Sequence, residues 1–272
     1  MAKKPVNQYA PRRSYRKIFW GIALLLAAAG AWAVHHYRAT LTMEWYRLVG
    51  TLPSEEKQLT PVPDPAKWEI LRLDLQRWRK HYADQYRAAK TDKEKKAVIA
   101  ASRDLLEHSL PEFMRCWLGT PWDFNGTATK PGEGKIACGY FVTTVLEAAG
   151  FRIERTALAQ QASQQILRTF LPMDDLRLRV GVPYKTFRFE TTRGRPGIYL
   201  VGLDTHIGFV VVKDQEFRFI HSSGSQPWCV VDESSEQALV LERSNYRVLG
   251  NITASDEVIR RWLMGEKFPT QR

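Results

Sequence analysis

The longest unbroken hydrophobic stretch of the chain lies close to its start. Residues 18–34 contain no charged side chain, and as a helix they would span about 25 Å, close to the thickness of a bilayer core. Residues 1–17 carry six Lys or Arg and no acid, which places this basic tail in the cytoplasm. The pattern predicts a single membrane-spanning anchor over residues 18–36, with a cleaved signal peptide as the alternative.

Two amphipathic helices are predicted after a proline-rich stretch. Residues 37–63 contain several prolines and solvated charges and are expected to form a tether. Asp64 followed by Pro65 is a typical helix start, and Thr91 begins a capping box that starts a second helix. Pro111 is expected to end or kink that second helix. We therefore predict a helical hairpin over residues 64–116, either as a cap on the main domain or as a stalk or partner surface.

The hydrophobic pattern changes from helical to strand-like along residues 117–272. A glycine-rich loop leads into a short helix from Cys138 to Ala149, residues 157–176 look helical, and a last helix runs to Gly265. Runs of β-branched and aromatic residues predict strands. These strands are Tyr184–Glu190, Gly197–Gly202, Ile207–Lys213, Glu216–His221, Trp228–Val231 and Ala238–Leu241. Helices followed by strands predict an α+β domain with helices packed on an antiparallel sheet.

The net charge of +11 adds little to this picture, because six of those charges lie in residues 1–17. The charge therefore mainly indicates membrane topology, and without a recognisable nucleic-acid-binding module we expect no nucleic-acid partner. Three cysteines, none in a Cys-x-x-Cys pair, exclude a disulfide scaffold and a zinc ribbon. Cys116 and Cys229 either pair or stay as free thiols, and no metal or cofactor is expected.

One thiol and two imidazoles form the strongest candidate for chemistry. Cys138 opens a helix, where the backbone N–H groups and the macrodipole are expected to lower the pKa of its thiol. His206 begins one predicted strand and His221 ends the next, and Lys213-Asp-Gln215 between them looks like a hairpin turn. Both imidazoles would then lie at the same end of adjacent strands. His206 could accept the thiol proton and His221 could orient its ring.

Five short segments, in order, resemble the NlpC-type papain-like cell-wall peptidases. They are Gly119-Thr-Pro-Trp-Asp-Phe-Asn-Gly126, Ala137-Cys-Gly-Tyr-Phe-Val142, Pro196-Gly-Ile-Tyr-Leu-Val201, Thr205-His-Ile-Gly-Phe-Val-Val211 and Phe219-Ile-His221. The resemblance covers about residues 117–242. It implies a papain-like core with Cys138 as nucleophile, His206 as base and His221 as the third member of the triad.

The resemblance also implies a substrate and a location. It points to hydrolysis of an amide bond in peptidoglycan stem peptides through a thioester, outside a bacterial inner membrane, with no protein partner indicated. Trp122, Phe124 and Tyr140 are expected to line the substrate pocket. The family usually has Asp-Cys-Ser-Gly where this chain has Ala-Cys138-Gly-Tyr, and it prefers Asp at Ile198. An acyltransferase with the same triad, or a catalytically silent scaffold protein of the cell envelope, remain alternatives.

Overall fold

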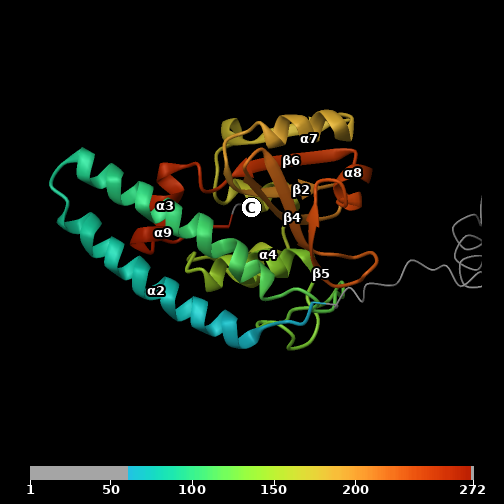
Figure 1. The fold of residues 1–272 in the computed structure, drawn as a ribbon, viewed down its shortest axis with the longest axis horizontal. Coiled ribbons are helices and arrows are strands. Elements are labelled where there is room, and N and C mark those ends of the chain that lie inside the picture. The colour runs from blue at the N-terminus through green and yellow to red at the C-terminus, as the bar shows by residue number, and fades with distance from the viewer. Residues whose placement is uncertain (1–60, 271–272) are drawn as a thin grey trace, which may run out of the picture. The chain divides into compact units, whose positions relative to one another are not determined.

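A helical hairpin, a group of short helices and a six-stranded antiparallel sheet follow one another along the chain (Figure 1). The structure, a computed structural model, describes residues 61–270. This arrangement confirms the predicted α+β class with helices packed on an antiparallel sheet. The predicted basic tail, membrane anchor and most of the tether lie outside the described residues. Within 61–270, no helix is both long enough and apolar enough to cross a membrane.

The hairpin consists of α2 (Pro65–Ala88) and α3 (Asp92–Arg115), with the predicted start signals in place. Asp64 accepts a hydrogen bond from the amide of Lys67 at 2.8 Å, and Thr91 forms the predicted capping box. The expectation that Pro111 ends the second helix is wrong, because α3 continues to Arg115. Pro111 and its apolar neighbours are buried, and this packing offsets the hydrogen bond that proline cannot donate.

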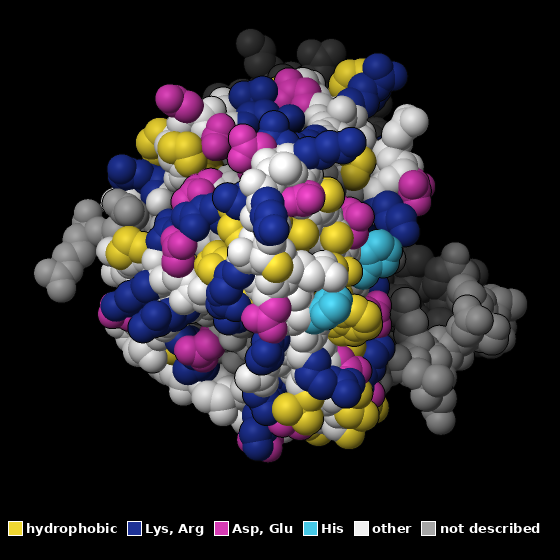
Figure 2. All heavy atoms as spheres, turned by 90° about the vertical axis from the view of Figure 1, so that its left-hand side faces the viewer, with side chains coloured by type: hydrophobic (Ala, Val, Ile, Leu, Met, Phe, Trp, Pro, Cys, Tyr) yellow, Lys and Arg dark blue, Asp and Glu magenta, His cyan; other side chains and the backbone are white. Residues whose placement is uncertain are grey.

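The outer surface of the hairpin carries charges of both signs. Figure 2 shows Lys and Arg side chains interspersed with Asp and Glu rather than a continuous basic patch. Several of these charges are paired within one helix turn, among them Arg72 with Glu69 and Lys80 with Asp84. The opposite face packs against α9 (Asp256–Met264) and α4 (Cys138–Ala148). The hairpin thus shares a core with the sheet domain.

Six strands make up the sheet, in the order β1-β6-β2-β3-β4-β5 with every neighbouring pair antiparallel. Their bounds are β1 Arg177–Val180, β2 Gly197–Leu203, β3 Ile207–Lys213, β4 Glu216–Ser222, β5 Val230–Ser234 and β6 Tyr246–Asn251. One face packs against α4, α9 and the hairpin, and the other against α7 (Tyr184–Thr192) and α8 (Leu239–Arg243). β2 and β3 are consequently buried on both faces.

Two predicted strands are helices, and two real strands were not predicted. Tyr184–Glu190 lies in α7, where Phe187 is buried but Phe189 is 56% exposed, so the burial follows helical spacing rather than alternation. Ala238–Leu241 lies at the start of α8. The arginine-rich β1 and the mixed-polarity β6 lack the continuous apolar run of the central strands.

The segment predicted as one helix over residues 157–176 is broken into three short pieces. These are α5 (Arg155–Ala159), α6 (Ser163–Arg168) and a 3₁₀ turn at Met173–Asp175. Neither α5 nor α6 has a side-chain cap at its start. Their importance lies in their position, since α5 packs against α4 and α6 packs against β2.

Candidate active site

Cys138 is the first residue of α4, as the sequence predicts. The preceding loop is held by a hydrogen bond from the Ala137 amide to the Gly126 carbonyl at 2.9 Å. Phe141, Val142 and Val145 on the inner face of α4 are fully buried and fix the helix against the sheet. Backbone N–H groups of its own helix start and of Ile207 on β3 act electrostatically on the thiol. The thiol therefore lies where α4 meets the strand that follows His206.

Burial reverses the expected pKa shift of this thiol. The surrounding protein raises the pKa of Cys138 above its ordinary value, because the thiolate loses hydration. Hydrogen bonds from the backbone N–H groups of Ile207, Gly139 and Cys138 itself lower the pKa, but by less. The prediction of a lowered pKa is therefore wrong, and the resting thiol is protonated at neutral pH. Its activation depends on a base.

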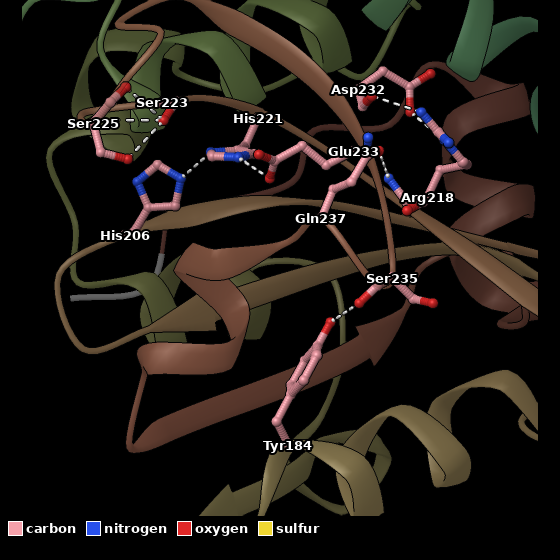
Figure 3. A network of polar contacts seen from close by, with 11 residues as sticks. Tyr184, His206, Arg218, His221, Ser223, Ser225, Asp232, Glu233, Ser235 and Gln237 are labelled. Atoms are coloured by element: carbon pink, nitrogen blue, oxygen red, sulfur yellow. Dashed lines mark hydrogen bonds and ion pairs between the residues drawn. The ribbon is translucent and has the colours of Figure 1, made fainter. Parts of the chain in front are cut away.

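The two imidazoles lie side by side, as the hairpin predicts. Asp214 and Gln215 form the turn, both with positive φ (51° and 60°), and β3 pairs with β4 from Lys213↔Glu216 to Phe209↔Ile220. His206 Nε2 is 2.8 Å from His221 Nδ1, and the rings are nearly perpendicular at 88° (Figure 3). A Cβ on Gly208 would lie 2.8 Å from the Cβ of His221. Glycine at this position therefore makes room for the second imidazole.

A carboxylate that the sequence interpretation missed completes a chain of polar contacts. Glu233 on β5 places Oε2 3.1 Å from His221 Nε2, so that His206, His221 and Glu233 follow one another across three adjacent strands (Figure 3). The register that brings it there pairs Phe219 with Glu233 and His221 with Val231. The predicted strand Trp228–Val231 ended too early. A strand extended to Ser234 would have shown a carboxylate beside His221.

The ionisation of these groups follows from burial. Loss of hydration lowers the pKa of both histidines far below the ordinary value, and the neighbouring His221 lowers that of His206 further. Both rings are therefore neutral near pH 7. Burial raises the pKa of Glu233 to about 7, although Arg218 acts in the opposite direction. The contact between His221 and Glu233 is thus a hydrogen bond made by a neutral imidazole rather than an ion pair.

Two clefts meet at the thiol and the first imidazole. Cys138 and His206 line both of them. The smaller, of about 580 Å³, extends along α6 past Ser163 and Gln164 and is called here the α6 cleft. The larger, of about 870 Å³, is called here the aromatic cleft. Its lining includes Trp122, Phe124 and Tyr140, which the sequence interpretation placed in the substrate pocket.

The walls of the aromatic cleft differ in exposure. The Trp122 ring packs against that of Trp228 with a centroid separation of 5.5 Å. Phe124 is 78% exposed and so presents its ring to solvent at the rim. Tyr140 donates no hydrogen bond into the core; its hydroxyl accepts one from Gln160 at 3.2 Å. No residue of α2 or α3 lines either cleft, so the hairpin leaves both uncovered.

The other two cysteines have different surroundings. Cys116, Cys138 and Cys229 are all free thiols. Burial raises the pKa of Cys116 to about 11 and also raises that of Cys229. Neither lines the α6 cleft or the aromatic cleft. Across residues 61–270, no group of three or more His, Cys, Asp or Glu side chains is arranged to hold a metal ion.

Comparisons of the chain with protein families, with curated proteins and with solved structures find no match in any of the three. The chemistry of the site therefore has to follow from its own residues: a half-buried thiol at a helix start, an imidazole pair and a carboxylate behind it.

Proposed function

We propose that the chain is a thiol hydrolase with a papain-like core, in which Cys138 is the nucleophile, His206 the general base and His221 the residue that orients it. The observation that carries this proposal is the meeting of the two clefts at Cys138 and His206, with the His206 ring held at 2.8 Å by His221. A substrate lying across both clefts would pass the thiol.

The geometry supports an acyl-transfer sequence. The Cys138 sulfur attacks an amide carbonyl carbon as its proton passes to Nδ1 of His206, the ring nitrogen that His221 leaves free. The backbone N–H groups at the start of α4 stabilise the oxyanion. The C–N bond then breaks, His206 returns the proton to the leaving amine, and a thioester remains. Water, deprotonated by His206, attacks the thioester and releases a carboxylic acid and the free thiol.

The proposed substrate is an amide bond in a peptidoglycan stem peptide, and the proposed site of action is the outer side of a bacterial inner membrane. Both rest on the resemblance of residues 117–242 to NlpC-type peptidases and on the apolar stretch at residues 18–34 behind a basic tail. Exposed Phe124 and half-buried Trp122 line the aromatic cleft and offer apolar contact area to such a substrate.

Reactivity of the thiol tests the proposal directly. Purified full-length protein is treated with iodoacetamide at pH 7.5, and the rate of alkylation at each cysteine is followed by peptide mass mapping. We expect Cys138 to react fastest, and His206→Asn to slow it by about a hundred-fold, the usual contribution of a general base. His108→Asn, which changes an exposed histidine of the hairpin, is the matched control and should leave the rate unchanged.

Three outcomes separate the proposal from its alternatives. Equal reactivity of Cys138 and Cys229, or no effect of His206→Asn, would show a silent site and favour a scaffold protein. With a reactive Cys138, digestion of purified muropeptides that is lost in Cys138→Ser supports hydrolysis. Transfer of the acyl group to an added amine in preference to water would instead identify an acyltransferase.

A further inference from the structure

Glu233 lies at the end of the polar chain and has no partner among the basic side chains around it. Its one side-chain hydrogen bond is the 3.1 Å contact with His221 Nε2. The adjacent Asp232, by contrast, is bound by two arginines, Arg218 at 2.7 Å and Arg115 at 2.9 Å. A carboxylate placed only to balance charge would be expected to pair with one of these guanidinium groups. Glu233 instead faces an imidazole whose other nitrogen contacts His206.

We propose that Glu233 is a positioning residue whose ionised carboxylate fixes the tautomers of both imidazoles so that His206 presents an unprotonated Nδ1 towards the cleft. This inference rests on the proposed function, because it describes how the base of that site is prepared.

Each neutral imidazole carries one N–H, so the direction of the chain is set at its end. The ionised Glu233 can only accept, which requires the proton of His221 to be on Nε2. Nδ1 of His221 is then an acceptor, so the proton of His206 is on Nε2. The lone pair of His206 Nδ1 is thereby left available to receive the thiol proton of Cys138.

Protonation of Glu233 reverses every bond in the chain. The carboxylic acid donates to Nε2 of His221, whose proton then lies on Nδ1 and is donated to Nε2 of His206. Nδ1 of His206 carries the remaining proton and cannot act as a base. No heavy atom has to move between the two states, since each contact at 2.8 and 3.1 Å serves in either direction.

The surroundings of Glu233 place this change close to neutral pH. Its side chain is 21% exposed, and burial raises its pKa to about 7. Two charged groups act on it electrostatically: Arg218 from β4 favours the ionised form, and Asp232 on its own strand opposes it. His221 from β4 faces it directly as a neutral ring. Arg115 of α3 pairs with Asp232. The carboxylate next to Glu233 in the sequence is thus bound to a residue of the hairpin.

The tautomers can be observed without any substrate. Full-length protein labelled with ¹⁵N-histidine is followed by long-range ¹H–¹⁵N correlation from pH 5.5 to 8.5, with the ring signals assigned by His206→Gln and His221→Gln. We expect the share of His206 with a protonated Nδ1 to fall from about nine-tenths at pH 6 to about one-tenth at pH 8, as one titration near pH 7 requires. Glu233→Gln should abolish this step. Glu236→Gln, an exposed acid on the turn after β5, should retain it.

Two results would overturn the inference: a His206 tautomer that stays constant across this pH range in the unmodified protein, or an unchanged step in Glu233→Gln. The first needs no variant, so it holds even where Glu233→Gln does not fold. A merely structural Glu233 would affect stability but would not produce a tautomer step that follows its own titration. A tautomer step accompanied by an unreactive Cys138 would support the inference and overturn the proposed hydrolase, so the two failures are distinguishable.

Discussion

Gly139, directly after the thiol, shows how one missing side chain shapes the site. A Cβ at this position would lie 2.3 Å from the Ala159 carbonyl oxygen. The end of α5 can therefore lie this close to the start of α4 only because residue 139 is a glycine. The lack of a side chain at this position therefore has a local steric reason: Ala159, which lines both clefts, lies too close to residue 139 for any side chain there.

Substitution Gly139→Ser is expected to destabilise the protein by about 1–3 kcal/mol, the usual cost of overpacking, because the obstacle is backbone rather than a movable side chain. Thermal unfolding of the full chain measures this. Ala137→Ser adds the same side chain two residues earlier, at the uncapped N-cap of α4, and should be neutral or stabilising. Equal effects of the two substitutions would contradict the steric explanation.

At the scale of elements, the hairpin supports the helix that carries the thiol. Arg79 on α2 donates to the Gly150 carbonyl at 2.6 Å, just beyond the end of α4, and its guanidinium lies 5.9 Å from the ring of Trp262 on α9. Trp262 in turn donates to the Ala149 carbonyl at 2.8 Å. The two carbonyl groups directly beyond the end of α4, at the end opposite Cys138, thus receive donors from α2 and α9.

Arg79→Ala is expected to reduce the free energy of unfolding by about 2 kcal/mol, since a hydrogen bond from a charged, half-buried group is lost. Arg77→Ala removes a neighbouring arginine whose side chain is 78% exposed. This substitution should change the free energy of unfolding by less than about 0.5 kcal/mol. Denaturant unfolding of the two variants provides the comparison. Similar losses for both would mean that the hairpin is not coupled to α4.

The elements also differ in how far the sequence alone predicts them. The imidazole pair was predictable because a two-residue turn fixes the register of β3 and β4, and the start of α4 because a glycine-rich loop precedes it. The prediction of a strand over Tyr184–Glu190 is wrong because Phe187 and Phe189 are two residues apart, like side chains on one face of a strand, whereas only Phe187 packs on the sheet. Glu233 was missed because its partner, His221, is brought to it by pairing of β4 with β5 rather than by sequence proximity.

For the molecule as a whole, the two neutral imidazoles of the site, His221 buried and His206 half-buried, imply sensitivity to acid. The pKa values of His206 and His221 are lower in the folded protein than in the unfolded chain, where they are about 6.5. The two neutral rings therefore contribute fully to the free energy of unfolding above pH 6.5, and this contribution is lost as pH falls below that value. Glu233 has the opposite effect, because its pKa is raised to about 7 in the folded protein. Its contribution to the stability of the fold is lost as pH rises from about 4.5 to 7. Two groups outweigh one, and the net effect of the three is destabilisation on acidification.

His206→Asn should therefore reduce the slope of the unfolding free energy against pH. The reduction between pH 6.5 and 4.5 is at most about 1.4 kcal/mol per pH unit, because one titrating proton is removed. Denaturant unfolding at several pH values tests this, with His81→Asn, an exposed histidine of α2, as the control expected to keep the original slope. An identical slope in His206→Asn would show that this ring is charged in the folded state.

The central place of β3 in the sheet has a last consequence, for how the two clefts can change shape. The strand is paired on both edges, with β2 and β4, and covered on both faces, so we expect its amide hydrogens to exchange with solvent only when the whole sheet unfolds. Across the clefts, the short, uncapped helices α5 and α6 have no such protection and should exchange by local opening. We therefore expect the two clefts to change shape on the side of α5 and α6, while the strand that follows the base keeps its place.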